Sequence, residues 1–145
     1  MRERIALLYF SSIPRGKPCI RTDVRFCAAI VFIKKSIGIA AVATTEHTWR
    51  YVPEDGEKEV RGAQIDLLID RDDNVINVCE MKWASGEYVI QKKEDIDIRN
   101  KVSALERETG TKKAIHVTMV TTYGVKRNMY YDEIQSEVVL DQLFD

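Results

Sequence analysis

Cysteine and histidine are scarce in this chain, and their scarcity limits the kinds of site that it can build. The 145 residues include three cysteines, at positions 19, 27 and 79, and two histidines. An odd cysteine count without a C-x-x-C spacing argues against a disulfide framework and against a zinc site. Reduced thiols are the simplest interpretation, so we expect a cytoplasmic location.

The chain also lacks long apolar runs and a charge excess of either sign. No stretch approaches the ~20 apolar residues of a membrane span, so we expect no membrane insertion. The formal net charge is −1, which excludes the global basic field of many DNA-binding proteins. Any contact with nucleic acid must therefore come from a local patch. The length is that of one domain, and we expect an irregular arm at residues 1–20 followed by one folded domain over residues 21–145.

Hydrophobic periodicity and turn residues divide the chain into helices and strands. In chain order, the sequence predicts a helix at 22–38, strands at 41–52, 63–70 and 75–83, a helix at 92–110 and a strand at 112–124. The segment "SEVVLDQLF" is a last short strand or a turn of helix. This order predicts an α/β fold with a mixed central sheet flanked by helices. The first helix is apolar on nearly all sides, so we expect it to be mostly buried.

Two neighbouring strands, within "QIDLLIDRDDNVINVCEMKW", carry charged residues inside apolar runs. Glu80 and Lys82 point to the same face because side chains alternate along a strand. A three-residue turn at residues 72–74 gives facing residues an index sum of 146 and places Asp66 opposite Glu80. A two-residue turn would send these two carboxylates to opposite faces. The sequence leaves both turns open, although three-residue hairpin loops are common.

Facing carboxylates are costly without a cation, because like charges directly opposite on a sheet are destabilising. Three arrangements would relieve the repulsion between Asp66 and Glu80: protonation of one carboxyl group, a bridge from Lys82, or a divalent metal ion. Mg²⁺ commonly uses one or two carboxylates together with waters and phosphate oxygens. Such an ion can polarise a phosphodiester, and Lys82 can orient the attacking water. The pattern therefore indicates a hydrolytic phosphodiesterase site. The simpler alternative is that these residues are three solvated surface charges.

These residues resemble the PD-(D/E)XK nuclease motif, in which Asp66 matches the D, Glu80 the (D/E) and Lys82 the K. The predicted order of elements is similar to the α-β-β-β-α-β order of the restriction-endonuclease-like core. More narrowly, the chain from about residue 44 to residue 145 is similar to the C-terminal nuclease-like domain of bacterial and archaeal AAA-type ATPases. The similar segments are "TWR", "GAQIDLLIDR", "INVCEMKW", "IRNKVSAL" and "HVTMVTTYGVKRNMY".

This resemblance implies a restriction-endonuclease-like fold and Mg²⁺- or Mn²⁺-dependent hydrolysis of DNA. It implies that Asp66 and Glu80 bind the metal ion and that the backbone carbonyl of Met81 is a further ligand. It also implies that Lys82 assists the attacking water, and that Asp23 supplies the acidic residue of the first helix. The chain has no G-x-x-x-x-G-K-[ST] motif for ATP hydrolysis. We therefore expect a nuclease-like domain that is detached from its ATPase part.

Basic residues near aromatic ones are the candidate contacts with DNA. Lys126 and Arg127 lie among the tyrosines of "YGVKRNMYY", and such a mixture can hold phosphates and stack bases. Arg50 and Arg99 are further candidates. An ordinary solvated loop has the same composition, so this signal is weaker than the D…E-x-K pattern.

Two other functions remain open. A non-catalytic module of the same fold would bind nucleic acid or a partner protein, such as an ATPase domain, and the near-neutral net charge favours this alternative. A part of an obligate assembly, such as a homo-oligomer, would be inert alone, and the apolar first helix favours that one. Binding of Mn²⁺ separates the nuclease from the non-catalytic module.

Overall fold

A five-stranded mixed sheet forms the centre of the fold, with the strand order β1-β2-β3-β4-β5. The computed structural model describes residues 24–56 and 59–141. In that part of the chain the strands are β1 (Thr44–Tyr51), β2 (Ala63–Arg71), β3 (Val75–Lys82), β4 (Ala114–Thr121) and β5 (Ser136–Val139). β1, β2 and β3 pair antiparallel, whereas β3, β4 and β5 pair parallel. The predicted α/β class and mixed sheet are confirmed, and the "SEVVLDQLF" segment supplies the fifth strand. The arm expected at residues 1–20 lies outside the described residues.

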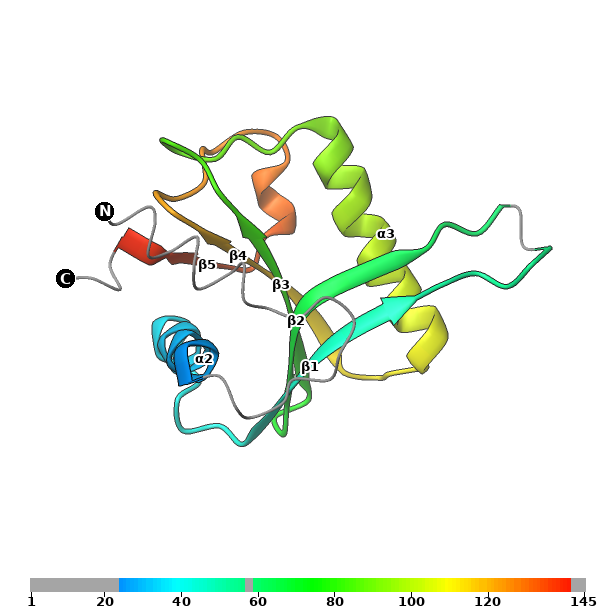
Figure 1. Ribbon diagram of the computed structural model, residues 1–145, viewed down its shortest axis with the longest axis horizontal. Helices are drawn as coiled ribbons and strands as arrows, with labels where there is room; N and C mark the ends of the chain where they lie inside the picture. Colours follow the sequence, from blue (N-terminus) through cyan, green and yellow to red (C-terminus); the bar gives the residue numbers. More distant parts are fainter. Residues whose placement is uncertain (1–23, 57–58, 142–145) are drawn as a thin grey trace.

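Two helices cover opposite faces of the sheet (Figure 1). They are α2 (Val24–Ser36) and α3 (Lys92–Thr109), and a short 3-10 helix, η1 (Tyr131–Glu133), precedes β5. Leu67 of β2 packs on the α2 side, and Leu68 packs on the α3 side. Because β2 and β3 are covered on both faces, their sequences read as nearly continuous apolar runs. Of the described helices, none is long and apolar enough to cross a membrane.

The ends of α3 follow from its capping residues. At the start, the Gln91 backbone N–H donates to Glu94 Oε2 at 3.1 Å as part of a capping box. At the end, Gly110 has a φ of 63° and its N–H donates to the Glu106 carbonyl. This left-handed conformation costs little for glycine. The helix end predicted from Gly110 is confirmed.

α2 is less buried than its composition predicts. Among the described side chains of α2, Ala29, Ile30 and Ile33 are buried, but Val31 is 65% exposed. The helix packs on one face of a single sheet, so its outward side has no sheet to cover it. The expectation of a mostly buried helix is therefore wrong for that side.

The connection between β2 and β3 is the three-residue turn. Leu67 pairs with Cys79, which gives facing residues an index sum of 146. Asn74 closes the turn with a φ of 64°, a left-handed conformation that asparagine adopts more readily than most residues. The β3 residues on the α3 side pack around Leu105, and Glu80 shares their face because side chains alternate.

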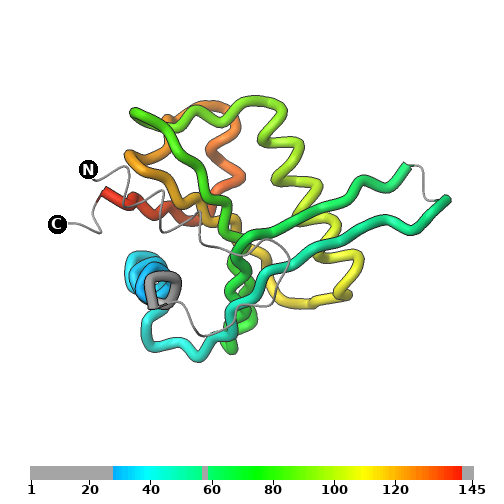
Figure 2. The backbone as a smooth tube through the Cα atoms, in the orientation of Figure 1, coloured from blue at the N-terminus to red at the C-terminus, as the bar shows by residue number. Residues whose placement is uncertain are grey.

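On the N-terminal side of Leu67, β2 is no longer paired with β3. There β2 continues with β1 as a two-stranded ribbon (Figure 1, Figure 2). The register between β1 and β2 shifts between His47 and Trp49, so that one β1 residue there faces two β2 residues, Asp66 and Leu67. This arrangement is a β-bulge, which bends its strand and changes the direction of nearby side chains. The bulge therefore lies at one of the residues that the sequence assigns to the site.

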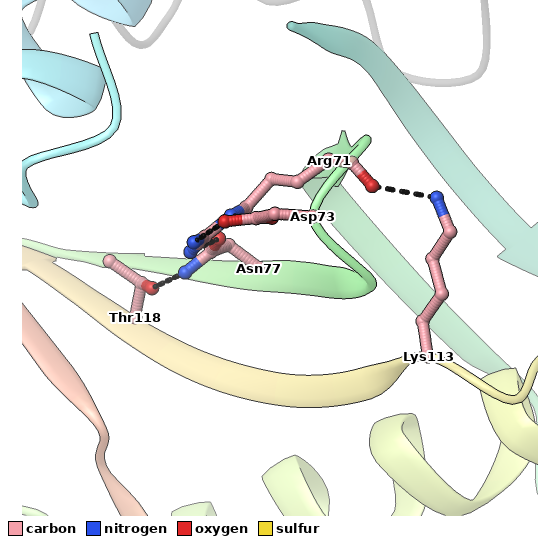
Figure 3. A network of polar contacts seen from close by, with 5 residues as sticks. All are labelled: Arg71, Asp73, Asn77, Lys113 and Thr118. Atoms are coloured by element: carbon pink, nitrogen blue, oxygen red, sulfur yellow. Dashed lines mark hydrogen bonds and ion pairs between the residues drawn. The ribbon is translucent and has the colours of Figure 1, made fainter. Parts of the chain in front are cut away.

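A polar network lies on the sheet near the β2–β3 turn (Figure 3). Arg71 contacts the Asp73 carboxylate at 2.8 and 2.5 Å and donates from Nη1 to Asn77 Oδ1 at 3.2 Å. Asn77 Nδ2 donates to Thr118 Oγ1 at 3.0 Å, and that hydroxyl lies 2.7 Å from Ser136 Oγ. Because Asn77 and Thr118 are buried, these bonds satisfy polar groups that water does not reach.

Candidate active site

A cavity of about 370 Å³ opens between the β1–β2 ribbon, the end of β3 and α3. Asp66, Glu80 and Lys82, the three residues of the D…E-x-K pattern, all line it. The structure therefore places these three residues around one cavity. The other lining residues come from the ribbon and from α3: Arg61, Gly62, Ala63, Gln64, Glu94, Asp97, Ile98, Asn100 and Lys101. The lining thus carries three cationic and four acidic side chains.

Glu80 is the buried acid of the cavity, with 6% of its surface exposed. Nζ of Lys101, from α3, lies 2.5 Å from Glu80 Oε1. A buried carboxylate is costly unless it is paired or bound to a metal ion, and Lys101 supplies that pairing. The sequence suggested Lys82 as a bridging cation, but the observed cation comes from a different element.

Asp66 is the exposed acid of the cavity. Its Oδ1 accepts a hydrogen bond from Gln64 Nε2 at 3.2 Å. This partner is neutral, so it leaves the negative charge of the carboxylate uncompensated. Asp66 also lies at the bulge, outside the hydrogen-bonded ladder with β3. Its position relative to Glu80 therefore depends on how the ribbon is held.

Lys82 is half-buried at the last residue of β3, where it is paired in register with Thr121 of β4. Within the described part of the chain, its ammonium forms no hydrogen bond or ion pair. Among the described residues, Lys101 is therefore the cavity lysine that binds a carboxylate, and Lys82 is the one that does not.

The donor set suits a hard divalent cation. Asp66 and Glu80 offer carboxylate oxygens to the same cavity, and Met81, whose carbonyl is the further expected ligand, lies next to Glu80 on β3. Asp23 lies outside the described residues. Those residues contain no group of three or more His, Cys, Asp or Glu side chains placed to hold a metal ion. An ion here would rest on two carboxylates and water, as Mg²⁺ often does.

Sequence reasoning missed the contribution of α3 to the cavity. Glu94, Asp97 and Lys101 line it, and they recur at i, i+3 and i+7, which places them on one face of the helix. This polar periodicity was a usable signal, because it sits beside the apolar positions that predicted the helix. Tyr88 also reaches this region, since its hydroxyl donates to Glu94 Oε1 at 3.4 Å. Burial and the Glu94 carboxylate raise the pKa of Tyr88, so its hydroxyl keeps its proton.

Two contacts hold the ribbon against α3 and form one wall of the cavity. Arg61 forms an ion pair with Asp97. Asn100 Nδ2 donates to the carbonyl oxygen of Gly62 at 3.2 Å. The ribbon that carries Asp66 is therefore anchored to the helix that carries the partner of Glu80.

The four candidate DNA contacts differ in their surroundings. Arg50 is exposed on β1. Arg99 donates to Asp95 at 3.0 Å and to Glu133 at 2.8 Å, so two carboxylates already compensate its charge. Lys126 and Arg127 are exposed on the loop after β4.

The loop after β4 is held in place by Glu137 of β5. This carboxylate accepts hydrogen bonds from the Val125 N–H at 2.9 Å and from the Tyr131 hydroxyl at 2.7 Å. The hydrogen bond to Glu137 raises the pKa of Tyr131. The Arg127 guanidinium lies 4.3 Å from the centre of the Tyr131 ring. These contacts hold the loop that carries Lys126 and Arg127 at the end of the sheet where β3 and β4 finish.

Cys79 lies beside Glu80 in the sequence but has a different role. It is 1% exposed and packs in the core on the α2 side. Burial raises the pKa of its thiol to about 12. The thiol therefore remains protonated and inert at neutral pH.

Comparison with known proteins assigns no family to this arrangement. No protein-family model matches the chain, and no curated protein matches it.

Proposed function

We propose that this chain is a PD-(D/E)XK-type nuclease domain with a restriction-endonuclease-like fold, and that it hydrolyses DNA phosphodiester bonds with Mg²⁺ or Mn²⁺. The proposal rests on one observation: Asp66, Glu80 and Lys82 line the same cavity at the end of β3. The sequence resemblance to the nuclease-like domains of AAA-type ATPases supports the same function.

In this function Asp66 and Glu80 hold the divalent ion. When bound, such an ion polarises the phosphodiester and favours ionisation of a water molecule. The Lys82 ammonium, which forms no ion pair with the described residues, orients the attacking water and offsets negative charge that develops on the phosphate. Glu94 lines the same cavity, but it accepts hydrogen bonds from the Tyr88 hydroxyl and the Gln91 N–H, so we assign it no metal-binding role.

In this function, bound DNA would extend from the cavity toward the loop after β4. Lys126 and Arg127 are exposed there, and their charges suit backbone phosphates. Arg50 is a further phosphate contact from the ribbon. Arg99 is a weaker candidate, because Asp95 and Glu133 already bind it.

The direct test is DNA cleavage by the purified chain with Mg²⁺ or Mn²⁺. Single- and double-stranded oligonucleotides are both needed as substrates, with EDTA as the metal-free control. Glu80→Gln should reduce the cleavage rate by at least about a hundredfold, because a metal ligand is lost. Asp70→Asn is the matched control on β2, since Asp70 binds Lys113 outside the cavity. Equal cleavage by the wild type and Glu80→Gln, with both folded by circular dichroism, would rule this function out.

One observation favours a second function, a non-catalytic module that binds nucleic acid. The Lys101–Glu80 ion pair already compensates the buried acid, so the fold does not need a metal ion there. In that case DNA binding would persist without cleavage, and Mn²⁺ would not bind in a calorimetric titration. Substitution of Lys126 and Arg127 together would then weaken DNA binding, whereas Glu80→Gln would not.

A further inference from the structure

The cation that compensates Glu80 comes from α3. Lys101 Nζ lies 2.5 Å from Glu80 Oε1, with 22% of the Lys101 side chain and 7% of the Glu80 side chain exposed. Lys82 belongs to the same cavity, yet it forms no ion pair within the described part of the chain. Lys101 therefore occupies Oε1, one of the two carboxylate oxygens of Glu80 that a metal ion could contact.

We propose that Lys101 is a built-in counter-cation that occupies Glu80 in the metal-free protein and that a divalent ion must displace. This inference rests on the proposed metal site. An ammonium group and a divalent ion on the same carboxylate repel each other, and this repulsion is strong in a partly buried cavity. Lys101 therefore weakens metal binding and keeps the buried carboxylate compensated until a metal ion arrives.

The cavity has room for the displaced ammonium. A lysine side chain carries its charge on a flexible four-carbon stem, and the cavity volume is about 370 Å³. Asp97 lies one helical turn before Lys101 and lines the same space, so its carboxylate, which already binds Arg61, is a second acceptor within reach at the i−4 position. Lys101 can therefore leave Glu80 without leaving the site.

Displacement also changes the charge that a substrate meets. The cavity is lined by three cationic and four acidic side chains, so addition of a divalent ion reverses its net sign. With the Lys101 ammonium released as well, two lysines face an incoming phosphodiester. The metal-free cavity thus disfavours an anionic substrate, and the loaded cavity favours it.

The first experiment compares Mn²⁺ binding by calorimetry in the wild type, Lys101→Met and Lys101→Gln. Both variants remove the competing charge, so both should bind Mn²⁺ about tenfold more tightly than the wild type. Lys101→Gln keeps a hydrogen-bonding group beside Glu80, so it provides the test if Lys101→Met does not fold. Lys93→Met is the matched control, because Lys93 is exposed on the same helix and lies outside the cavity.

The second experiment uses the wild-type protein alone. Acetylation of lysines, followed residue by residue with mass spectrometry, should label Lys101 several-fold faster after Mn²⁺ is added, while Lys93 labels at an unchanged rate. Mn²⁺ binding that leaves the Lys101 labelling rate and the affinity of the Lys101 variants unchanged would overturn this inference and leave the nuclease function standing. Absence of Mn²⁺ binding in every protein would overturn both.

Discussion

Two polar clusters flank the β2–β3 hairpin, and they differ in how completely their groups are satisfied. Near the turn, Arg71, Asp73 and Asn77 bind one another and continue to Thr118 and Ser136. At the other end, the cavity holds an exposed carboxylate with a neutral partner and a lysine without one among the described residues. A closed network fixes the structure of its strands, whereas a cluster with open donors and acceptors can bind something else.

The largest effect should come from the open cluster. Asp66→Asn should reduce metal-dependent DNA cleavage by a hundredfold or more, a loss of about 2.7 kcal/mol in transition-state stabilisation. The melting temperature should change little, because Asp66 is exposed and its hydrogen bond is with Gln64. Cleavage assays and thermal unfolding of the same preparation measure the cleavage rate and the melting temperature. A large loss of stability would show that Asp66 stabilises the fold, as the residues of the network near the turn do.

The opposite result is expected in the closed network. Asn77→Ala removes a buried amide that joins Arg71 to Thr118, so the free energy of unfolding should fall by about 2–3 kcal/mol. Cleavage per folded molecule should remain unchanged at a temperature well below the unfolding transition. Urea denaturation measures the first quantity. If cleavage falls as far as in Asp66→Asn, the two clusters are not separate.

The smallest effect concerns acid stability. The hydrogen bond from Arg71 is the main cause that lowers the pKa of Asp73 below its usual value. Because the folded pKa lies below the unfolded pKa of about 3.9, the contribution of Asp73 to stability is present above that pH and is lost as the pH falls through the folded pKa. The wild type and Asp73→Asn should therefore differ above about pH 4 and converge below it. Urea denaturation over a pH series tests this convergence, and parallel curves would argue against the Arg71–Asp73 contribution.

The sequence predicted the strands well because their signals are local. Alternation and turn residues located β2 and β3, and the register that pairs Leu67 with Cys79 was one of two that the turn allowed. Glu80 and Asp66 both stand in apolar runs, but only Glu80 is buried, whereas Asp66 is exposed. These features depend on residues that are neighbours in the chain or across one hairpin.

The parts that the sequence did not reveal depend on tertiary packing. Lys101 is 21 residues from Glu80, and no short spacing rule connects a helix face to a strand end. The exposure of Val31 depends on how many layers cover α2, which composition does not specify. The bulge at Asp66 likewise reflects where β2 leaves one neighbour while it stays paired with the other.

For the proposed metal site, this departure of β2 has a consequence for ion size. Asp66 travels with the ribbon, and Glu80 is part of the central sheet, so no ladder hydrogen bond fixes the gap between their oxygens. The Arg61–Asp97 and Asn100–Gly62 contacts join the ribbon to α3. Mg²⁺ and Ca²⁺ differ by a few tenths of an ångström in metal–oxygen distance. The preference between such ions would therefore depend on the contacts between the ribbon and α3, which lie away from the two carboxylates.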